Sequence, residues 1–239
     1  DLVECYPHPL GDMIRAAEQQ AALLAYFRNN VLHLLALPAL LACLVSHNQV
    51  LTRQRARDAI KGIYGLLRAD LFLRWEPGEL DAVIDRTQEA LCRRGLILSD
   101  GETEILRAPP PNSEASPELH QLGEIIRPTL ERQFLTLALL QHHGSGQLTR
   151  AALEEGTHLL AQRLAMLYEI NSAEFSEKLL FANVIRNLID ADILQADDAG
   201  LLQFDERITL AAAQTELLLA ADVRHSIQRI ARAAAPASQ

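Results

Sequence analysis

Aromatic residues, glycine and proline are scarce in this chain of 239 residues. Aromatic side chains make up 5% of it, with only 11 glycines and 10 prolines. Leucine and alanine dominate instead, and long stretches repeat apolar residues with the 3.6-residue period of a helix. This composition predicts a mainly helical protein, and the length suits one large or two small domains.

Cysteine is also rare. Cys5, Cys43 and Cys92 are far apart in the sequence, and no C-x-x-C pair is present. An odd number of distant cysteines signals neither a disulfide framework nor a zinc site. A reducing cytosol is the compartment that fits this cysteine usage.

Positive charge is in deficit, with 22 Lys and Arg against 31 Asp and Glu and a formal net charge of −9. A general nucleic-acid binder needs a basic surface for phosphate contacts, so that class of protein is disfavoured.

No charged segment precedes an apolar run at the start, which argues against a signal peptide. Because the chain starts with Asp1 rather than Met, we expect a fragment or a processed product.

Long apolar runs are missing as well. The most apolar stretch, residues 31–45, is shorter than a membrane span and is interrupted by His33 and Pro38. It predicts a core helix, with an interfacial helix as the alternative. Pro38 is expected to bend or break that helix, because proline removes a backbone donor.

The common catalytic motifs are absent. The sequence has no Walker loop, no dinucleotide-binding glycine triplet, no H-E-x-x-H and no G-x-S-x-G. His142 and His143 stand beside glycines, but without further ligands nearby they indicate a solvated helix end rather than a metal site. We therefore expect no catalytic residue, no metal and no cofactor in this chain.

Landmarks of secondary structure recur at an offset of 97 residues. They are a helix cap, the start of a helix and the first strand of a hairpin. The pairs are Thr52 and Thr149, Pro77 and Glu174, and Leu96 and Ile193. This repetition predicts two copies of a helix-helix-helix-hairpin unit, which is the element order of a winged helix-turn-helix.

The predicted fold is thus mainly α with two short β-hairpins, arranged as two winged-helix-like helical units in tandem. Asn171 and Glu174 fit a capping box at a helix start. The helices that would enter a DNA groove carry carboxylates such as Asp81, Asp85 and Glu177, so no nucleic-acid partner is expected.

The expected segments are an irregular lead-in (1–15), a first unit (16–107), a Pro-rich linker (108–116), a second unit (117–208), and a C-terminal helix and tail (209–239).

Polar residues before the apolar run form one candidate binding site: Arg28, Asn29, Asn30 and His33. Asparagine is a modest helix former, so an Arg-Asn-Asn sequence inside a helix is unusual. Arg28 and Asn30 can clamp a phosphate or carboxylate. Docking to a neighbouring domain is the favoured interpretation, and His33 is expected to be a buried structural histidine.

A basic stripe forms the second candidate site. It lies opposite the apolar face of the helix that follows Thr52 and consists of Arg53, Arg57, Lys61 and Arg68. A solvated face is the default interpretation of such a stripe, and contact with an anionic partner is the sharper alternative.

Three segments of the sequence resemble bacterial glycerol-3-phosphate acyltransferases. They are YFRNNVLH at 26–33 with ALP at 36–38, DLFLRW at 70–75, and LAQRL at 160–164 with YEIN and EF at 168–175. The resemblance extends over about residues 16–229. It implies the C-terminal region of a peripheral enzyme on the cytoplasmic face of the bacterial inner membrane. Such enzymes transfer an acyl group to position 1 of glycerol 3-phosphate and so start phospholipid synthesis.

The family's catalytic motif, a histidine followed five positions later by aspartate, is not found at any of the eight histidines. The resemblance therefore implies that catalysis belongs to an upstream acyltransferase domain, which this chain packs on, stabilises or regulates. Other implied partners are membrane phospholipids and the acyl donor, acyl carrier protein or acyl-CoA. Lipid headgroups or the acidic carrier protein are the candidates for the basic stripe. The alternative from another class is a free-standing winged-helix interaction or regulatory protein.

Overall fold

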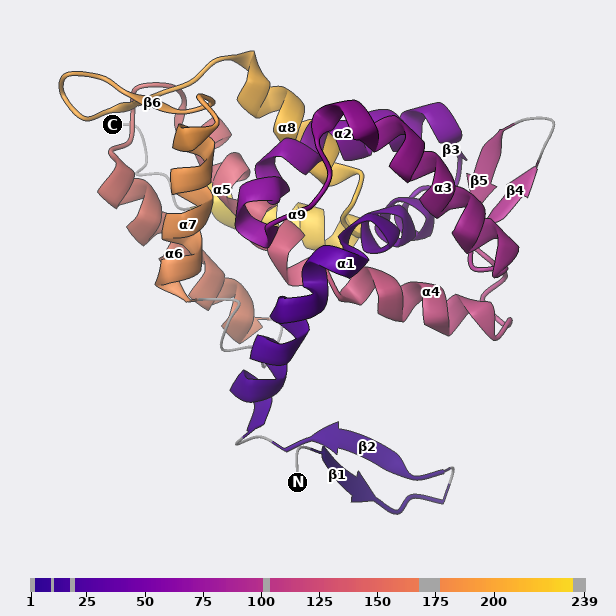
Figure 1. Ribbon diagram of the computed structural model, residues 1–239. Coiled ribbons are helices and arrows are strands. Elements are labelled where there is room, and N and C mark those ends of the chain that lie inside the picture. Colours follow the sequence, from indigo (N-terminus) through magenta and orange to yellow (C-terminus); the bar gives the residue numbers. More distant parts are fainter. Residues whose placement is uncertain (1–2, 10, 18–19, 101–103, 168–176, 234–239) are drawn as a thin grey trace.

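The computed structural model describes residues 3–9, 11–17, 20–100, 104–167 and 177–233 (Figure 1). Helices dominate these residues, and the strands are short and antiparallel. This confirms the prediction of a mainly α fold with small hairpins. The predicted capping box at Asn171 and Glu174 lies outside the described residues.

The first unit begins with the long helix α1 (Ala21–His47) and the short strand β3 (Leu51–Thr52). Helix α2 (Arg53–Leu71), the 3-10 turn η2 (Pro77–Glu79), helix α3 (Leu80–Arg93) and the hairpin of β4 (Leu98–Asp100) and β5 (Ile105–Arg107) follow. Strand β3 pairs with β5, so the sheet order is β3-β5-β4. The Thr52 hydroxyl accepts a hydrogen bond from the backbone N–H of Arg55 at 3.2 Å, as its predicted capping role requires.

The second unit repeats this order. It contains α5 (Arg127–His143), α6 (Arg150–Leu167), α7 (Lys178–Asp190), and the hairpin of β6 (Gln195–Ala196) and β7 (Leu202–Gln203). Thr149 caps α6 by accepting from the N–H of Ala152 at 3.2 Å, and an isolated bridge pairs it with Leu201. Both predicted hairpins are therefore present. The likeness to a winged helix stays a prediction.

The 97-residue offset extends to individual backbone hydrogen bonds. The N–H of Leu96 donates to the carbonyl of Leu91 at 3.0 Å, and the N–H of Ile193 donates to Leu188 at the same distance. The residue before each donor has a positive φ, +72° at Gly95 and +58° at Asp192. The two units thus make the same turn between their third helix and their hairpin.

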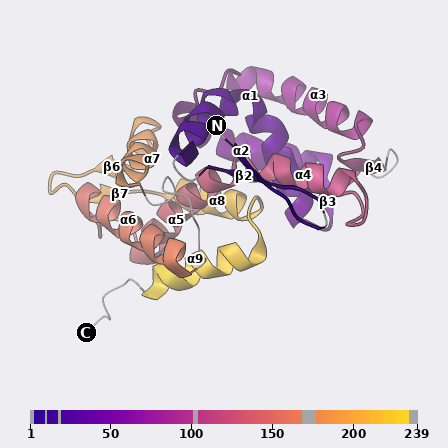
Figure 2. The same ribbon diagram turned by 90° about the horizontal axis from the view of Figure 1, so that it is seen from below.

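The two units share one apolar core. Helix α2 of the first unit packs against α7 and against α8 (Glu206–Glu216), which follows the second unit. At Gly62 of α2, an added Cβ would lie 1.7 Å from Oε1 of Gln214 on α8, so glycine permits this close approach. Figure 2 shows α1, α2 and α3 on one side of the molecule and α6 and α7 on the other.

Each unit is followed by one or two helices that pack back onto the unit's first helix. After the first unit, α4 (Ala115–Glu124) packs against α1. After the second, α8 and α9 (Ala221–Ala233) pack against α5. The C-terminal half of α1 and most of α5 are consequently enclosed, and residues such as Leu40, Leu44 and Phe134 are almost inaccessible to solvent.

Several sequence-based expectations need correction. The lead-in is not irregular, because β1 (Val3–Tyr6) and β2 (Met13–Ala16) pair as an antiparallel hairpin. Helix α1 continues through Pro38, so that residue does not break it, and a bend at Pro38 stays a prediction. A single C-terminal helix from about residue 209 was expected, but α8 and α9 are separate. No glycine or proline lies between these two helices, and the consecutive Leu218 and Leu219 in the break are both buried.

Candidate functional site

The basic stripe on α2 is engaged in bonds within the protein. Arg57 Nη2 lies 2.5 Å from Asp85 Oδ1, and Lys61 Nζ lies 3.0 Å from Asp81 Oδ1; both carboxylates belong to α3. The ion pair with Asp85, together with the charge of Asp81, raises the pKa of Arg57 despite partial burial. These cations therefore bridge α2 to α3.

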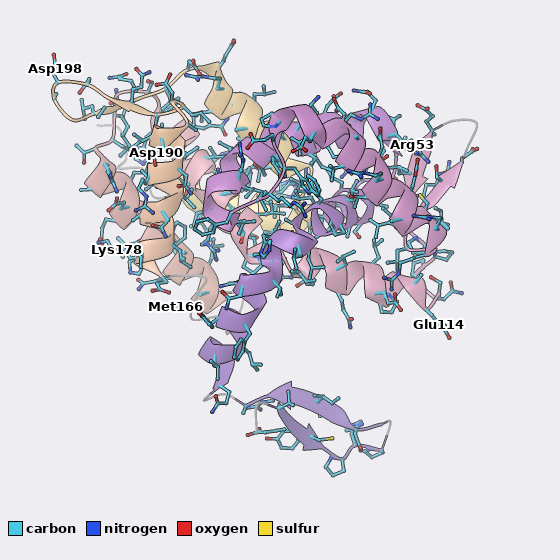
Figure 3. The ribbon with its side chains drawn as sticks, viewed as in Figure 1. Arg53, Glu114, Met166, Lys178, Asp190 and Asp198 are labelled. Carbon is cyan, nitrogen blue, oxygen red and sulfur yellow. The ribbon has the colours of Figure 1, made fainter. Side chains whose placement is uncertain are left out.

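The remaining two residues of the stripe also have partners. Arg53 donates from Nη2 to the hydroxyl of Ser99 on β4 at 3.1 Å, and Arg68 pairs with Glu76. Figure 3 shows Arg53 on the side of the molecule that carries the hairpin of β4 and β5. Contact of the stripe with an anionic partner stays a prediction, and such a partner would have to compete with these internal bonds.

An ion pair also joins the second and third helices of the second unit, but only one of its two positions matches the first unit. Lys178 Nζ of α7 lies 2.5 Å from Glu155 Oε2 of α6, and Lys178 follows Asp81 by 97 residues. The third helix is thus acidic at this position in the first unit and basic in the second. At this offset Glu155 corresponds to Asp58 rather than to Arg57 or Lys61, and both partners of the Lys178 pair are about half exposed, so the pair contributes little to stability.

The residues around Arg28 lie on a protruding part of the molecule. Asn29, Asn30 and His33 are exposed, and the side chain of Arg28 lies outside the described part. The expectation that His33 is a buried structural histidine is therefore wrong. Among the described side chains in the first half of α1 most are exposed, whereas Leu32 is buried.

Large apolar side chains gather on the same part of the chain. We call β1, β2 and the first half of α1, up to Leu34, the apolar arm; Figure 1 shows its hairpin standing apart from the helical body. More than two fifths of the surface of each of these side chains is exposed: Val3, Tyr6, Met13, Ile14, Leu23, Tyr26, Phe27, Val31 and Leu34. Soluble monomers rarely expose large apolar patches, so this gathering of exposed apolar side chains points to an interaction surface.

Helix α1 also contains a stretch that passes a length and composition test for a membrane span. Among the described residues, Asn29–His47 is long and apolar enough to cross a bilayer, which corrects the expectation that this run is too short. Slightly more than half of it is buried within the fold, and its last part, Ala39 to Val45, has almost no exposed surface. The prediction of a core helix is confirmed for that last part.

A buried carboxyl group on α5 was missed by the sequence reasoning. Burial raises the pKa of Glu131 to about 7, although Arg127 Nε at 3.4 Å opposes this shift. Burial also lowers the pKa of His47 at the end of α1, and the positive charges of His120 and Arg224 add to that effect. The sequence signal for the buried site on α5 is the presence of polar residues, such as Glu131, in the middle of a mostly apolar helix.

Glu131 is too enclosed to act as a general base on a substrate. A general base must reach the proton that it abstracts, and 7% of the Glu131 side chain is exposed. Across the ranges that the structure describes, no group of three or more His, Cys, Asp or Glu side chains is arranged to hold a metal ion.

The DLFLRW segment occupies a structural junction after α2. Phe72 ends the helix in the left-handed conformation with φ +51°, and the hydroxyl of Tyr64 accepts from the N–H of Trp75 at 3.0 Å. The guanidinium of Arg74 lies 4.6 Å from the centre of the Trp75 ring, a cation–π distance. Burial raises the pKa of Asp70, while Arg132 and Arg186 oppose the shift. This segment fixes the path of the chain between α2 and α3.

Comparisons with known proteins agree with the three segments that pointed to a family. Residues 1–197 match the family described as the glycerol-3-phosphate acyltransferase C-terminal region. The chain is similar to the glycerol-3-phosphate acyltransferases of Pseudomonas fluorescens strain Pf0-1, with 37% identity over 232 residues, and of Pseudomonas aeruginosa strain UCBPP-PA14, with 38% identity over 223 residues. These alignments cover 97% and 93% of this chain but only 28% and 26% of the relatives, so the chain spans about a quarter of their length. The chain therefore belongs to the glycerol-3-phosphate acyltransferase family and corresponds to its C-terminal region.

Proposed function

We propose that this chain is the non-catalytic C-terminal region of a glycerol-3-phosphate 1-O-acyltransferase. The parent enzyme would transfer an acyl group from acyl carrier protein or acyl-CoA to position 1 of glycerol 3-phosphate, the first step of phospholipid synthesis. The observation that carries this proposal is the family match over residues 1–197, together with relatives about four times as long. The same match favours this function over a free-standing regulatory protein.

The chemistry of acyl transfer supports the non-catalytic role. The reaction needs a base within hydrogen-bond reach of the glycerol hydroxyl and donors for the thioester oxyanion. No histidine of the chain has an aspartate five positions later, and Glu131 is buried away from solvent. We therefore place the reaction in an upstream acyltransferase domain of the same protein.

The apolar arm would dock on that upstream domain. Its exposed Tyr26, Phe27 and Val31 lie on the first half of α1, beside Asn29 and Asn30, which can add polar contacts. Burying a large apolar side chain contributes about 1.5–3 kcal/mol, so several of them suffice for a stable contact between domains. The region would then stabilise the enzyme or support its turnover on the cytoplasmic face of the inner membrane.

Activity assays test the assignment. The purified chain, incubated with an acyl thioester and glycerol 3-phosphate, should show no turnover, whereas the full protein should be active. A full protein that lacks this region should lose stability or turnover. Turnover by the isolated chain would disprove the non-catalytic role, and an equally active and stable truncation would disprove the supporting role.

A point substitution in the full protein tests the arm. Phe27→Asp puts a charge on a side chain that is 50% exposed here, and it should lower the melting temperature and the activity of the full protein. Leu159→Asp on α6 is the matched control, because Leu159 is 53% exposed but lies outside the arm. Equal effects of the two substitutions would argue against docking through the arm.

A further inference from the structure

A hollow of about 440 Å³ lies between α1 and α3. Its volume falls in the range of small-molecule sites, and most of its surface is apolar. Figure 2 shows the two helices side by side, and they are in contact in the fold. The hollow is lined by His33, Leu34, Leu37, Pro38, Trp75, Val83, Arg86, Thr87, Ala90, Leu91 and Arg94.

Helix α3 separates its charges between two faces. Asp81 and Asp85 pair with cations of α2, whereas Arg86 and Arg94 line the hollow toward α1. Arg86 donates from Nε to the backbone carbonyl of Ala82 at 3.2 Å. In the ranges covered by the structure, neither guanidinium lies within 4.0 Å of a carboxylate, unlike Arg57 or Arg68. In a chain of net charge −9, two arginines without an acidic partner beside one apolar hollow are a specific arrangement.

We propose that this hollow binds a single-chain amphiphile with an anionic head. The apolar tail would lie against Leu37, Pro38 and Leu91, because these side chains form the apolar part of the lining. The head, a carboxylate or a phosphate, would accept charge-assisted hydrogen bonds from Arg86 and Arg94. A neutral ligand of the same shape would form no charge-assisted hydrogen bonds with either guanidinium group. The proposal stands independently of the function proposed above.

Trp75 makes binding directly measurable, because it is the only tryptophan of the chain and lines the hollow. Laurate and dodecyl phosphate, each kept below its micelle concentration, should shift the fluorescence of the purified 239-residue chain with saturation. Decanoate should bind more weakly, by roughly fourfold for each methylene group that the shorter tail withdraws from the hollow. Neutral glycerol monolaurate and headgroup-only butyl phosphate should bind at least about tenfold more weakly than dodecyl phosphate.

Three variants locate the site. Arg86→Ala combined with Arg94→Ala should weaken binding of dodecyl phosphate by roughly ten- to hundredfold, since charged hydrogen bonds are lost. Arg93→Ala is the matched control, because it removes an exposed arginine next to Arg94 that does not line the hollow, and it should change the affinity less than about twofold. Ala90→Phe should block the tail by filling the hollow. Circular dichroism checks that each variant is folded.

Definite outcomes would overturn the proposal. One is that the unmodified chain shows no saturable binding of either anionic amphiphile, and another is that it binds glycerol monolaurate as tightly as dodecyl phosphate. A third is that Arg93→Ala weakens binding as much as the double substitution of Arg86 and Arg94. Full binding by a folded Ala90→Phe variant would also overturn it. Tighter binding of dodecyl phosphate than of laurate, with the same dependence on Arg86 and Arg94, would support the site and assign it to phosphate heads. The reverse order would support it and assign it to carboxylates.

Discussion

Replacing Glu131 with glutamine should make the chain more stable at alkaline pH and leave it unchanged at acidic pH. Glu131 has a pKa of about 7 in the folded protein because it is buried, against an ordinary value of 4.5. The folded state therefore holds this proton more tightly than the unfolded state does. The stabilising contribution is fully present below pH 4.5 and is lost as the pH rises to about 7.

The size of this loss follows from the difference between the two pKa values. Each pKa unit corresponds to 1.36 kcal/mol, so ionised Glu131 costs the folded protein about 3 kcal/mol at pH 8. Glutamine has nearly the same shape and no proton to lose, so the cost disappears. Arg127 keeps Glu124 as an ion-pair partner at 2.7 Å, so the substitution does not strand a buried cation.

Urea unfolding of the variant and the parent chain at pH 5, 6, 7 and 8 measures the effect. The difference in unfolding free energy should rise from about 1 kcal/mol at pH 5 to about 3 kcal/mol at pH 8 in favour of the variant. Taking the difference removes contributions of other groups such as His47, which titrate in both proteins. Glu118→Gln, at an exposed position of α4, should show no such rise. A difference that is constant or falls with pH would refute the assignment of a raised pKa to Glu131.

Three further predictions concern stability, and each is checked by urea unfolding. Leu40→Ala should lower the unfolding free energy by about 2–5 kcal/mol, since Leu40 is fully buried on α1; a loss below about 1 kcal/mol would contradict its place in the core. Thr52→Ala and Thr149→Ala should each cost about 1 kcal/mol, because both residues cap equivalent helices; a loss at only one of them would argue against equivalent caps. Asp192→Val should cost about 1–3 kcal/mol because φ is +58° there, whereas Asp192→Gly should be tolerated; equal losses would show that backbone conformation is not the cause.

The repeated architecture was predictable because its markers are local. A capping threonine, a helix start and a hairpin depend on neighbouring residues, so Thr52 and Thr149 could be paired from sequence alone. The hairpin at residues 3–16 was not predictable in this way. Pro7, Pro9 and Gly11 are typical of a loop, and the four-residue strands on either side are too short for a clear alternating pattern.

The partners of charged side chains could not be predicted, since they depend on how helices pack. Arg57 and Asp85 are 28 residues apart, and nothing local indicates that α2 and α3 bring them together. The hollow likewise combines Leu37 with Arg94, which only tertiary structure places side by side. The exposure of His33 likewise depends on how other helices pack against α1, which cannot be read from its own residues.

The contacts of α2 with α7 and α8 have a consequence for how the chain unfolds. This helix belongs to the first unit but buries its apolar face partly against α7 of the second unit and against α8, whose Gln214 side chain lies against Gly62. Separating the two units would expose that face, so neither repeat has a complete core of its own. The chain should therefore melt in a single cooperative transition despite its internal repetition. Protease cleavage within residues 108–114 should yield two fragments that remain associated until both unfold together.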